Sequence, residues 1–209
     1  MVKRSKLAIG GAALLAVGLL VSTQVVSQEK GPAKEEGQGN WMEMMAKWQA
    51  MGATGPEHKK LVGMVGTWET ESRMWMMPGM EPIVSKGTAE IRLIFDGRFI
   101  EQRYKCGEGE QAFEGLGYEG YDRIKKQYVS VWLDSQSTGI FMSYGQMDES
   151  GKVCTYHGKM DDPFTGEKDK VVKSVAREIN KDKAVFEMYD KRPGVGEFKS
   201  MEITYTRKK

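Results

Sequence analysis

Turn-forming residues recur at even intervals from residue 66 to the end of the chain, and this spacing restricts the fold more than any other feature of the sequence. The runs between the turns are rich in Val, Ile, Thr, Tyr, Phe and Trp, and segment 88–93 alternates polar and apolar residues as a half-buried strand does. The turns contain Gly, Pro, Asp or Asn and lie at 78–79, 96–97, 107–109, 122–126, 134–139, 148–151, 161–166, 180–182 and 193–196. These nine turns predict ten strands.

The short connections determine how the predicted strands pair. A connection of a few residues joins antiparallel neighbours, whereas a parallel crossover needs about a dozen residues and usually a helix. An even number of strands lets the first and last strands pair antiparallel, which closes the sheet and removes its edges. The sequence therefore predicts a mainly β protein, a closed antiparallel up-and-down β-barrel of about ten strands over residues 66–209, preceded by N-terminal helices. A two-sheet β-sandwich is the alternative arrangement of the same strands.

Strand parity predicts which residues meet at one end of the barrel. The first strand begins at Gly66-Thr67-Trp68, and the last of an even number of strands returns to that end and finishes at Arg207. We expect Trp68 and Arg207 to meet there, where a guanidinium over an indole face contributes about 0.5–2 kcal/mol. A helix that starts at Pro56 arrives at the same end. This end is therefore expected to be closed.

The opposite end carries the longer turns, and long loops at one end of a barrel commonly carry binding function. We expect a mouth there through which a small, largely apolar ligand enters. The residues expected to line it are Met76, Met80, Tyr104, Trp132 and Asp134. Asp134 also belongs to the segment WLDSQSTG, whose Asp, Ser and Gly residues are typical of a strand-to-strand turn.

The first 65 residues have a different character. Basic residues precede an apolar run from Leu7 to Val26, a pattern that predicts a signal peptide over 1–27 and export to the periplasm or the extracellular space. If it is not cleaved, the run is long enough to act as a membrane anchor, and we expect no other membrane contact. Residues 28–40 hold no large apolar side chain and predict a disordered tether, and apolar residues at helical spacing predict helices within 41–65.

The charge pattern and the cysteines exclude two further possibilities. Removal of Lys3, Arg4 and Lys6 with the signal peptide changes the formal net charge from +2 to −1, so we expect no nucleic-acid partner. Cys106 and Cys154 fall at opposite ends of the predicted barrel, which predicts two free thiols.

Several motifs resemble one bacterial family, the domain-of-unknown-function family numbered 1579. The resemblance follows the chain in order through GPEHKKLVGMVGTWE at 55–69, MPGMEP at 77–82, GRFIEQ at 97–102, GYDRIKKQYVSVWLDSQSTG at 120–139, DDPFTGE at 161–167 and MEITYTR at 201–207. It implies a fold like the lipocalin and fatty-acid-binding barrels, frequent export and no established activity. Gly66-Thr67-Trp68 also resembles the Gly-x-Trp start of lipocalins, in which the Trp lies at the closed end beneath an Arg of the last strand.

Two other functions stay open at this point. A haem or metal protein would use an inward-facing His157, or the methionines of the first mouth turn, whose soft thioethers suit Cu(I). An enzyme acting at the mouth would need a nucleophile and a base, and Ser135 has no histidine near it in the predicted topology. The packing and turn roles of these residues are favoured, so no cofactor and no catalytic residue is expected.

Overall fold

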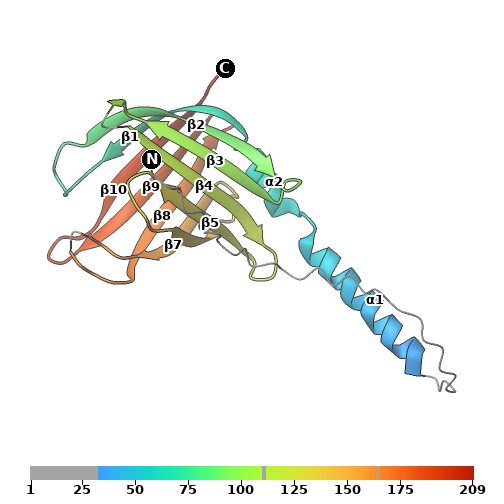
Figure 1. Cartoon of the computed structure of the whole chain (residues 1–209). Coiled ribbons are helices and arrows are strands. Elements are labelled where there is room, and N and C mark those ends of the chain that lie inside the picture. The colour runs from blue at the N-terminus through green and yellow to red at the C-terminus, as the bar shows by residue number, and fades with distance from the viewer. Residues whose placement is uncertain (1–32, 110–111, 164) are drawn as a thin grey trace, which may run out of the picture. The chain divides into compact units, whose positions relative to one another are not determined.

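The computed structural model describes residues 33–109, 112–163 and 165–209 (Figure 1). Contacts divide the chain after Glu43, and the unit Met44–Lys209 contains the barrel. The two helices are α1 (Ala33–Gly52) and α2 (Pro56–Val62). The ten strands are β1 (Gly66–Met74), β2 (Ile83–Ile94), β3 (Phe99–Cys106), β4 (Phe113–Asp122), β5 (Gln127–Asp134), β6 (Phe141–Met147), β7 (Val153–Met160), β8 (Lys170–Asn180), β9 (Lys183–Arg192) and β10 (Gly196–Arg207).

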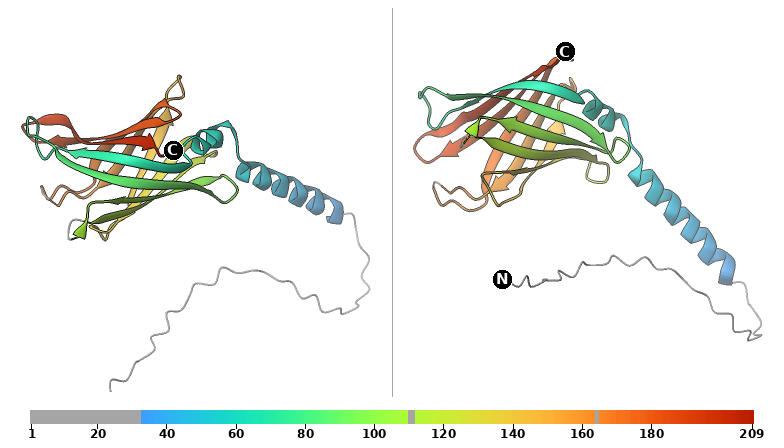
Figure 2. Two further views of the ribbon diagram at one scale, coloured as in Figure 1. Left: turned by 90° about the horizontal axis from the view of Figure 1, so that it is seen from above. Right: turned by 45° about the horizontal axis from the view of Figure 1, so that its top comes forward.

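The strands form one closed barrel in which each strand pairs antiparallel with its neighbours in sequence, and β1 pairs with β10. The two views in Figure 2 show the strands wrapping around a common axis, with α2 at one end. This arrangement confirms the predicted up-and-down barrel and excludes the sandwich. The turns also fall where the spacing of Gly, Pro, Asp and Asn predicted them, because short connections between paired strands require those residues.

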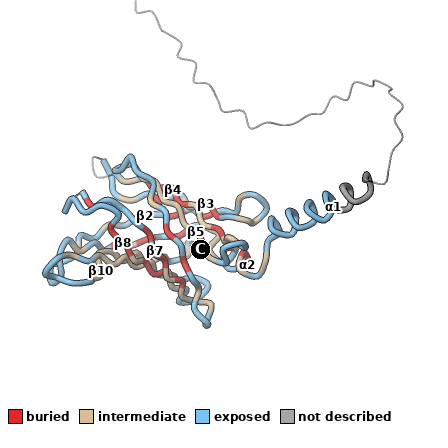
Figure 3. The backbone as a smooth tube through the Cα atoms, turned by 90° about the horizontal axis from the view of Figure 1, so that it is seen from below, coloured by how far each residue is buried: buried red, intermediate tan, exposed pale blue. Residues whose placement is uncertain are grey.

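Two hydrogen bonds that cross the barrel identify its inner face. Gln102 Nε2 on β3 donates to Tyr205 Oη on β10 at 3.2 Å, and Tyr156 Oη on β7 donates to the Glu119 carboxylate oxygen on β4. In neither pair are the two strands neighbours in the sheet, so all four side chains point inward. Every second residue from these positions shares the inner face. Figure 3 shows the buried positions within these strands.

The Gly-x-Trp motif and Arg207 build the closed end. The Arg207 guanidinium carbon lies 4.1 Å from the centroid of the Trp68 ring, and its Nη1 and Nη2 donate to the carbonyl oxygens of Val65 and Gly63 at 2.7 Å each. Trp68 is 1% exposed, and its Nε1 donates to a backbone carbonyl at 2.8 Å. A Cβ at position 66 would lie 2.7 Å from Arg207 Nη1, and Gly66 has φ +133°, so the motif needs glycine for both reasons.

Helix α2 packs at the closed end through its apolar face. Leu61 is buried in the main core cluster, and His58 is buried beside Tyr121 with ring centroids 6.0 Å apart. His58 Nδ1 accepts a hydrogen bond from the Gly55 N–H at 3.0 Å, and burial lowers the pKa of His58. The helix therefore covers this end, as the position of Pro56 predicted.

The helix before the barrel differs from the expected boundaries. Helix α1 starts at Ala33, within the predicted tether, because residues 33–36 are Ala, Lys and Glu, which favour helix without any apolar periodicity. The predicted signal peptide and residues 28–32 lie outside the described residues. Among the described residues, none of the helices has the length and apolar character needed to cross a membrane.

Candidate functional site

Three aromatic side chains gather on the inner face at the end opposite α2. Tyr104 on β3 contacts Phe113 on β4 and Trp132 on β5 with ring centroids 6.0 and 6.3 Å apart, and Phe113 and Trp132 stack at 6.5 Å. Phe113 and Trp132 are half-buried, whereas Tyr104 is 3% exposed. The structure therefore places Tyr104 beneath an aromatic rim made by the other two rings.

Two glycines on β4 allow the Trp132 indole to lie flat against the inner wall. A Cβ at Gly115 would lie 2.1 Å from Trp132 Cζ2, and a Cβ at Gly117 would lie 3.1 Å from Trp132 Cε3. No other side chain at these positions leaves the indole where it is. Two inward positions of β4 are thus glycine because the Trp132 ring occupies the space that their side chains would need.

Asp134 combines a turn role with contact to this rim. Its Oδ1 accepts from the Gln136 backbone N–H at 2.9 Å, which is the turn role that WLDSQSTG predicted. Its Oδ2 accepts from Trp132 Nε1 at 3.1 Å and fixes the orientation of the indole. Tyr104, Trp132 and Asp134 therefore form one contiguous group.

The predicted methionines lie in the turn between β1 and β2 and not in this aromatic group. Met76 and Met80 are exposed at 37% and 54%. Met77 of the same turn lies against an inner-face side chain, since its Sδ accepts from Arg192 Nη1 at 3.2 Å. Because Arg192 contacts its thioether, Met77 serves as packing at the mouth.

Inward-facing side chains in the middle of their strands keep accessible surface. Residues of a well-filled small barrel are buried at these positions, because they lie far from both ends. Six inward residues from five strands are instead only half-buried: Gln102, Glu119, Ser130, Phe186, Met188 and Ile203. Since outside solvent cannot reach them through the wall of the barrel, this surface faces space in the interior.

Two buried hydroxyl groups on the inner face make no hydrogen bond. Tyr104 Oη and Thr70 Oγ1 are buried without a partner, in residues that are 3% and 4% exposed. Thr70, Ser72 and Cys106 lie close enough to the phenol to act on its pKa. None of them meets Tyr104 Oη in hydrogen-bond geometry. Burial raises the pKa of Tyr104 to about 12, opposed by the Thr70 hydroxyl. Buried polar groups are nearly always paired, so this unpaired couple on the inner face of the barrel is a feature that needs a partner.

Glu119 is an inward carboxyl group in the middle of its strand. Burial raises the pKa of Glu119, and the hydrogen bond from Tyr156 opposes that shift. Burial also raises the pKa of Cys154 to about 12 and the pKa of Tyr128 to about 12. Burial thus favours the uncharged form of each of these three groups.

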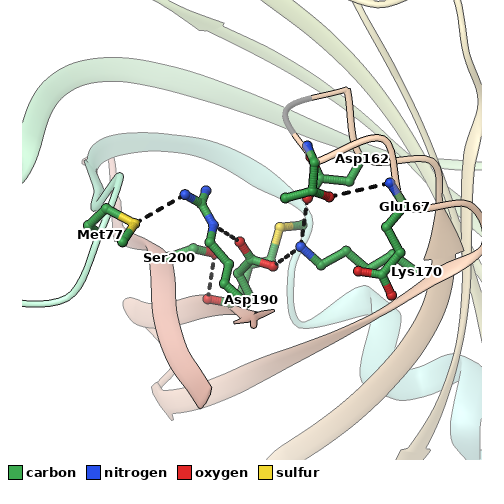
Figure 4. Close-up of polar contacts among 9 residues, drawn as sticks. Met77, Asp162, Glu167, Lys170, Asp190 and Ser200 are labelled. Atoms are coloured by element: carbon green, nitrogen blue, oxygen red, sulfur yellow. Dashed lines mark hydrogen bonds and ion pairs between the residues drawn. The ribbon is translucent and has the colours of Figure 1, made fainter. Parts of the chain in front are cut away.

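An ion-pair network occupies one side of the mouth (Figure 4). Lys170 on β8 is 5% exposed and pairs with Asp162 at 2.7 Å and with Asp190. Arg192 Nε pairs with Asp190 at 2.9 Å. This network was not predicted from the sequence, because Lys170 and Asp190 lie in separate strands and are brought together only by the β8–β9 register.

The structure does not support the haem hypothesis. His157 is exposed on the outer face of β7, since the inward residues of that strand are its neighbours Tyr156 and Gly158, and an outward imidazole cannot bind haem in the interior. Within the described ranges, no group of three or more His, Cys, Asp or Glu side chains is arranged to hold a metal ion. Cys106 and Cys154 are free.

Comparisons with known proteins agree with the fold and add no activity. The model of a family described as "Protein of unknown function (DUF1579)" matches residues 53–207. The crystal structure of Rv2717c from M. tuberculosis is similar with a TM-score of 0.54 and 13% identity, covering 75% of this chain and 100% of that one. A redesigned β-barrel has a TM-score of 0.39 and 10% identity, covering 72% and 96% of the two chains. No curated protein matches.

Proposed function

The chain belongs to the DUF1579 family of proteins of unknown function, and we propose that this member binds a small, largely apolar molecule inside its barrel. The observation that carries the proposal is the pair of unpartnered hydroxyls of Tyr104 and Thr70 on the inner face of a barrel whose other inward side chains keep accessible surface. A bound molecule with one polar group would give these hydroxyls their missing hydrogen bond. The aromatic rim of Phe113 and Trp132 would contact its apolar part.

The rim is the proposed route of entry. It lies at the end opposite α2, and its rings keep accessible surface that an apolar molecule would cover. Gly115 and Gly117 support this role, because a ring held flat against the wall leaves the centre of the mouth free. Met76 and Met80 remain proposed contacts at the outer edge of the mouth, since both are exposed there.

Binding is tested with the uncharged dye Nile red, whose fluorescence rises in an apolar environment. We expect the full chain to bind the dye and Trp132→Ala to weaken binding about tenfold or more, because an aromatic side chain contributes on the order of 1.5–3 kcal/mol when buried against a ligand. Tyr144→Ala is the matched control, since Tyr144 is an exposed aromatic residue on the outer face of β6. Equal loss in both variants, or no binding by the wild type, would contradict the proposal.

We also propose that the protein is exported to the periplasm or the extracellular space. The basic residues before the apolar run 7–26 support this proposal. N-terminal sequencing of the protein from separated cell fractions tests it. A chain that starts near Gln28 outside the cytoplasm is the expected result, and an intact Met1 start in the cytoplasm would refute it.

A further inference from the structure

We propose that the barrel selects molecules whose polar group carries no charge, such as long-chain alcohols, ketones or esters. This inference rests on the proposed binding function and adds the chemical class of the ligand. It follows from the charges on the inner face of the barrel, taken strand by strand. The fatty-acid-type alternative would instead require a free basic group that points inward.

The basic side chains that face inward in the described strands are Lys170, Arg192 and Arg207. Lys170 is buried between two carboxylates, Asp162 at 2.7 Å and Asp190. A third anion would have to displace one of these carboxylates from a cation whose charge they already neutralise. Lys170 is therefore not available to an anionic ligand.

The two arginines are engaged as well. Arg192 pairs with Asp190 at 2.9 Å, donates to the Met77 sulfur at 3.2 Å and lies 5.7 Å from the centroid of the Phe198 ring. Arg207 lies at the closed end, with its guanidinium over the Trp68 ring and hydrogen-bonded to backbone carbonyl oxygens. Neither arginine presents a free guanidinium face to the interior.

A cationic ligand meets the opposite difficulty. Of the inward carboxyl groups, Asp190 is already paired with Lys170 and Arg192, and Asp134 accepts a hydrogen bond from Trp132 at the rim. Glu119, in the middle of its strand, is hydrogen-bonded to Tyr156 in surroundings that favour its neutral form. A cation would have to ionise this buried acid and lose its own hydration, and such a buried pair rarely repays its desolvation. The carboxyl group therefore does not attract cations as an ionised surface glutamate would.

The two unpaired hydroxyl groups suit a ligand whose polar group carries no charge. Tyr104 Oη and Thr70 Oγ1 can each donate or accept a hydrogen bond, so an alcohol, ketone or ester oxygen that reaches them can supply the partner that each lacks. No charge has to be paired in this arrangement. A carboxylate would enter only after taking up a proton, and with a solution pKa of about 4–5 this reduces its apparent affinity at pH 7 by about 100-fold or more.

The test uses three probes of equal chain length, decanol, decanoate and decylammonium, titrated into the full chain by calorimetry at pH 7. Decanol is expected to bind at least about 100-fold more tightly than either ion. The affinity for decanoate is expected to rise about tenfold for each pH unit lowered toward pH 5, as its neutral form becomes populated. Equal or tighter binding of decanoate or decylammonium would overturn the inference and leave the binding function standing.

Glu119→Gln provides the matched variant, because its amide has the shape of the carboxyl group and no charge. We expect it to keep the wild-type order of the three probes. A tenfold or larger gain in decanoate affinity would show that Glu119 is ionised in the wild type and would overturn the inference. Failure of all three probes together with Nile red would instead refute the proposed binding function.

Discussion

Replacing Tyr104 with phenylalanine separates a binding hydroxyl from a structural one. The ring of Tyr104 is 3% exposed and packs against Phe113 and Trp132, so Tyr104→Phe keeps these contacts. The change removes one hydroxyl group, which makes no hydrogen bond in the structure.

The expected change in stability follows from that missing bond. A buried polar group without a partner costs about 1–3 kcal/mol, so deleting it recovers part of this cost. Because Thr70 and Ser72 are neighbours and relieve some of it, we expect the free energy of unfolding to stay constant or rise by about 1 kcal/mol. Urea unfolding followed by tryptophan fluorescence measures this value.

Tyr205→Phe is the matched control. Tyr205 is buried on the same inner face, but its hydroxyl accepts a hydrogen bond from Gln102 at 3.2 Å. Losing this bond should lower the free energy of unfolding by about 0.5–1.5 kcal/mol. The two tyrosines, changed in the same way, are thus expected to shift stability in different directions.

Tyr104→Phe is also expected to change the affinity for decanol. If the Tyr104 hydroxyl serves a ligand, Tyr104→Phe should weaken decanol binding about threefold to tenfold while the protein stays as stable as the wild type. A loss of stability equal to that of Tyr205→Phe, with unchanged decanol affinity, would show that the protein itself uses this hydroxyl and would refute the reasoning.

Three further predictions concern stability. Trp68→Ala should lower the free energy of unfolding by about 3–5 kcal/mol, measured by urea titration, and a change below about 1 kcal/mol would refute the role of Trp68 in closing the barrel. Lys170→Met should cost about 3–5 kcal/mol, since it leaves Asp162 and Asp190 buried without this cation, and a neutral result would show that the two acids take up protons at little cost. Burial raises the pKa of Glu119, so the folded state keeps a proton that the unfolded chain releases above about pH 4.5. The contribution of Glu119 to the free energy of unfolding is therefore complete below that pH, and it is lost as the pH rises toward the pKa of the folded state. Glu119→Gln should therefore gain stability relative to the wild type as the pH rises above 4.5. Thermal unfolding across pH 4–8 measures this gain, and a constant difference between the melting temperatures of the two proteins would contradict the raised pKa.

The closed end could be predicted from the sequence, and the interior could not. Trp68 and Arg207 are assigned to one end by counting turns, because each turn reverses the chain and parity alone determines the end. The inward direction of Glu119 depends on which alternate set of β4 residues faces the interior. Both sets of FEGLGYEGYD contain a glutamate and aromatic residues, so the alternation of apolar residues carries no signal there.

The glycines that accommodate Trp132 are a signal that is visible in the sequence. Its partners Gly115 and Gly117 alternate on one face of a strand, and glycine inside a strand often marks a close approach by another group. Three glycines in FEGLGYEGYD were visible as a pattern, but the ring that fills the two inner positions comes from the next strand and is assigned by register alone. The start of helix α1 was missed for a different reason, since residues 33–36 favour helix by propensity and residues 33–40 hold no apolar residue pattern that predicts one.

Native mass spectrometry of the full chain, purified without denaturation, tests the central claim most directly. The account predicts a reproducible added mass that belongs to one uncharged, largely apolar organic molecule, or that appears on incubation with decanol and is lost in Trp132→Ala. A polypeptide mass that stays bare after incubation with decanol would contradict the claim that this barrel holds a ligand.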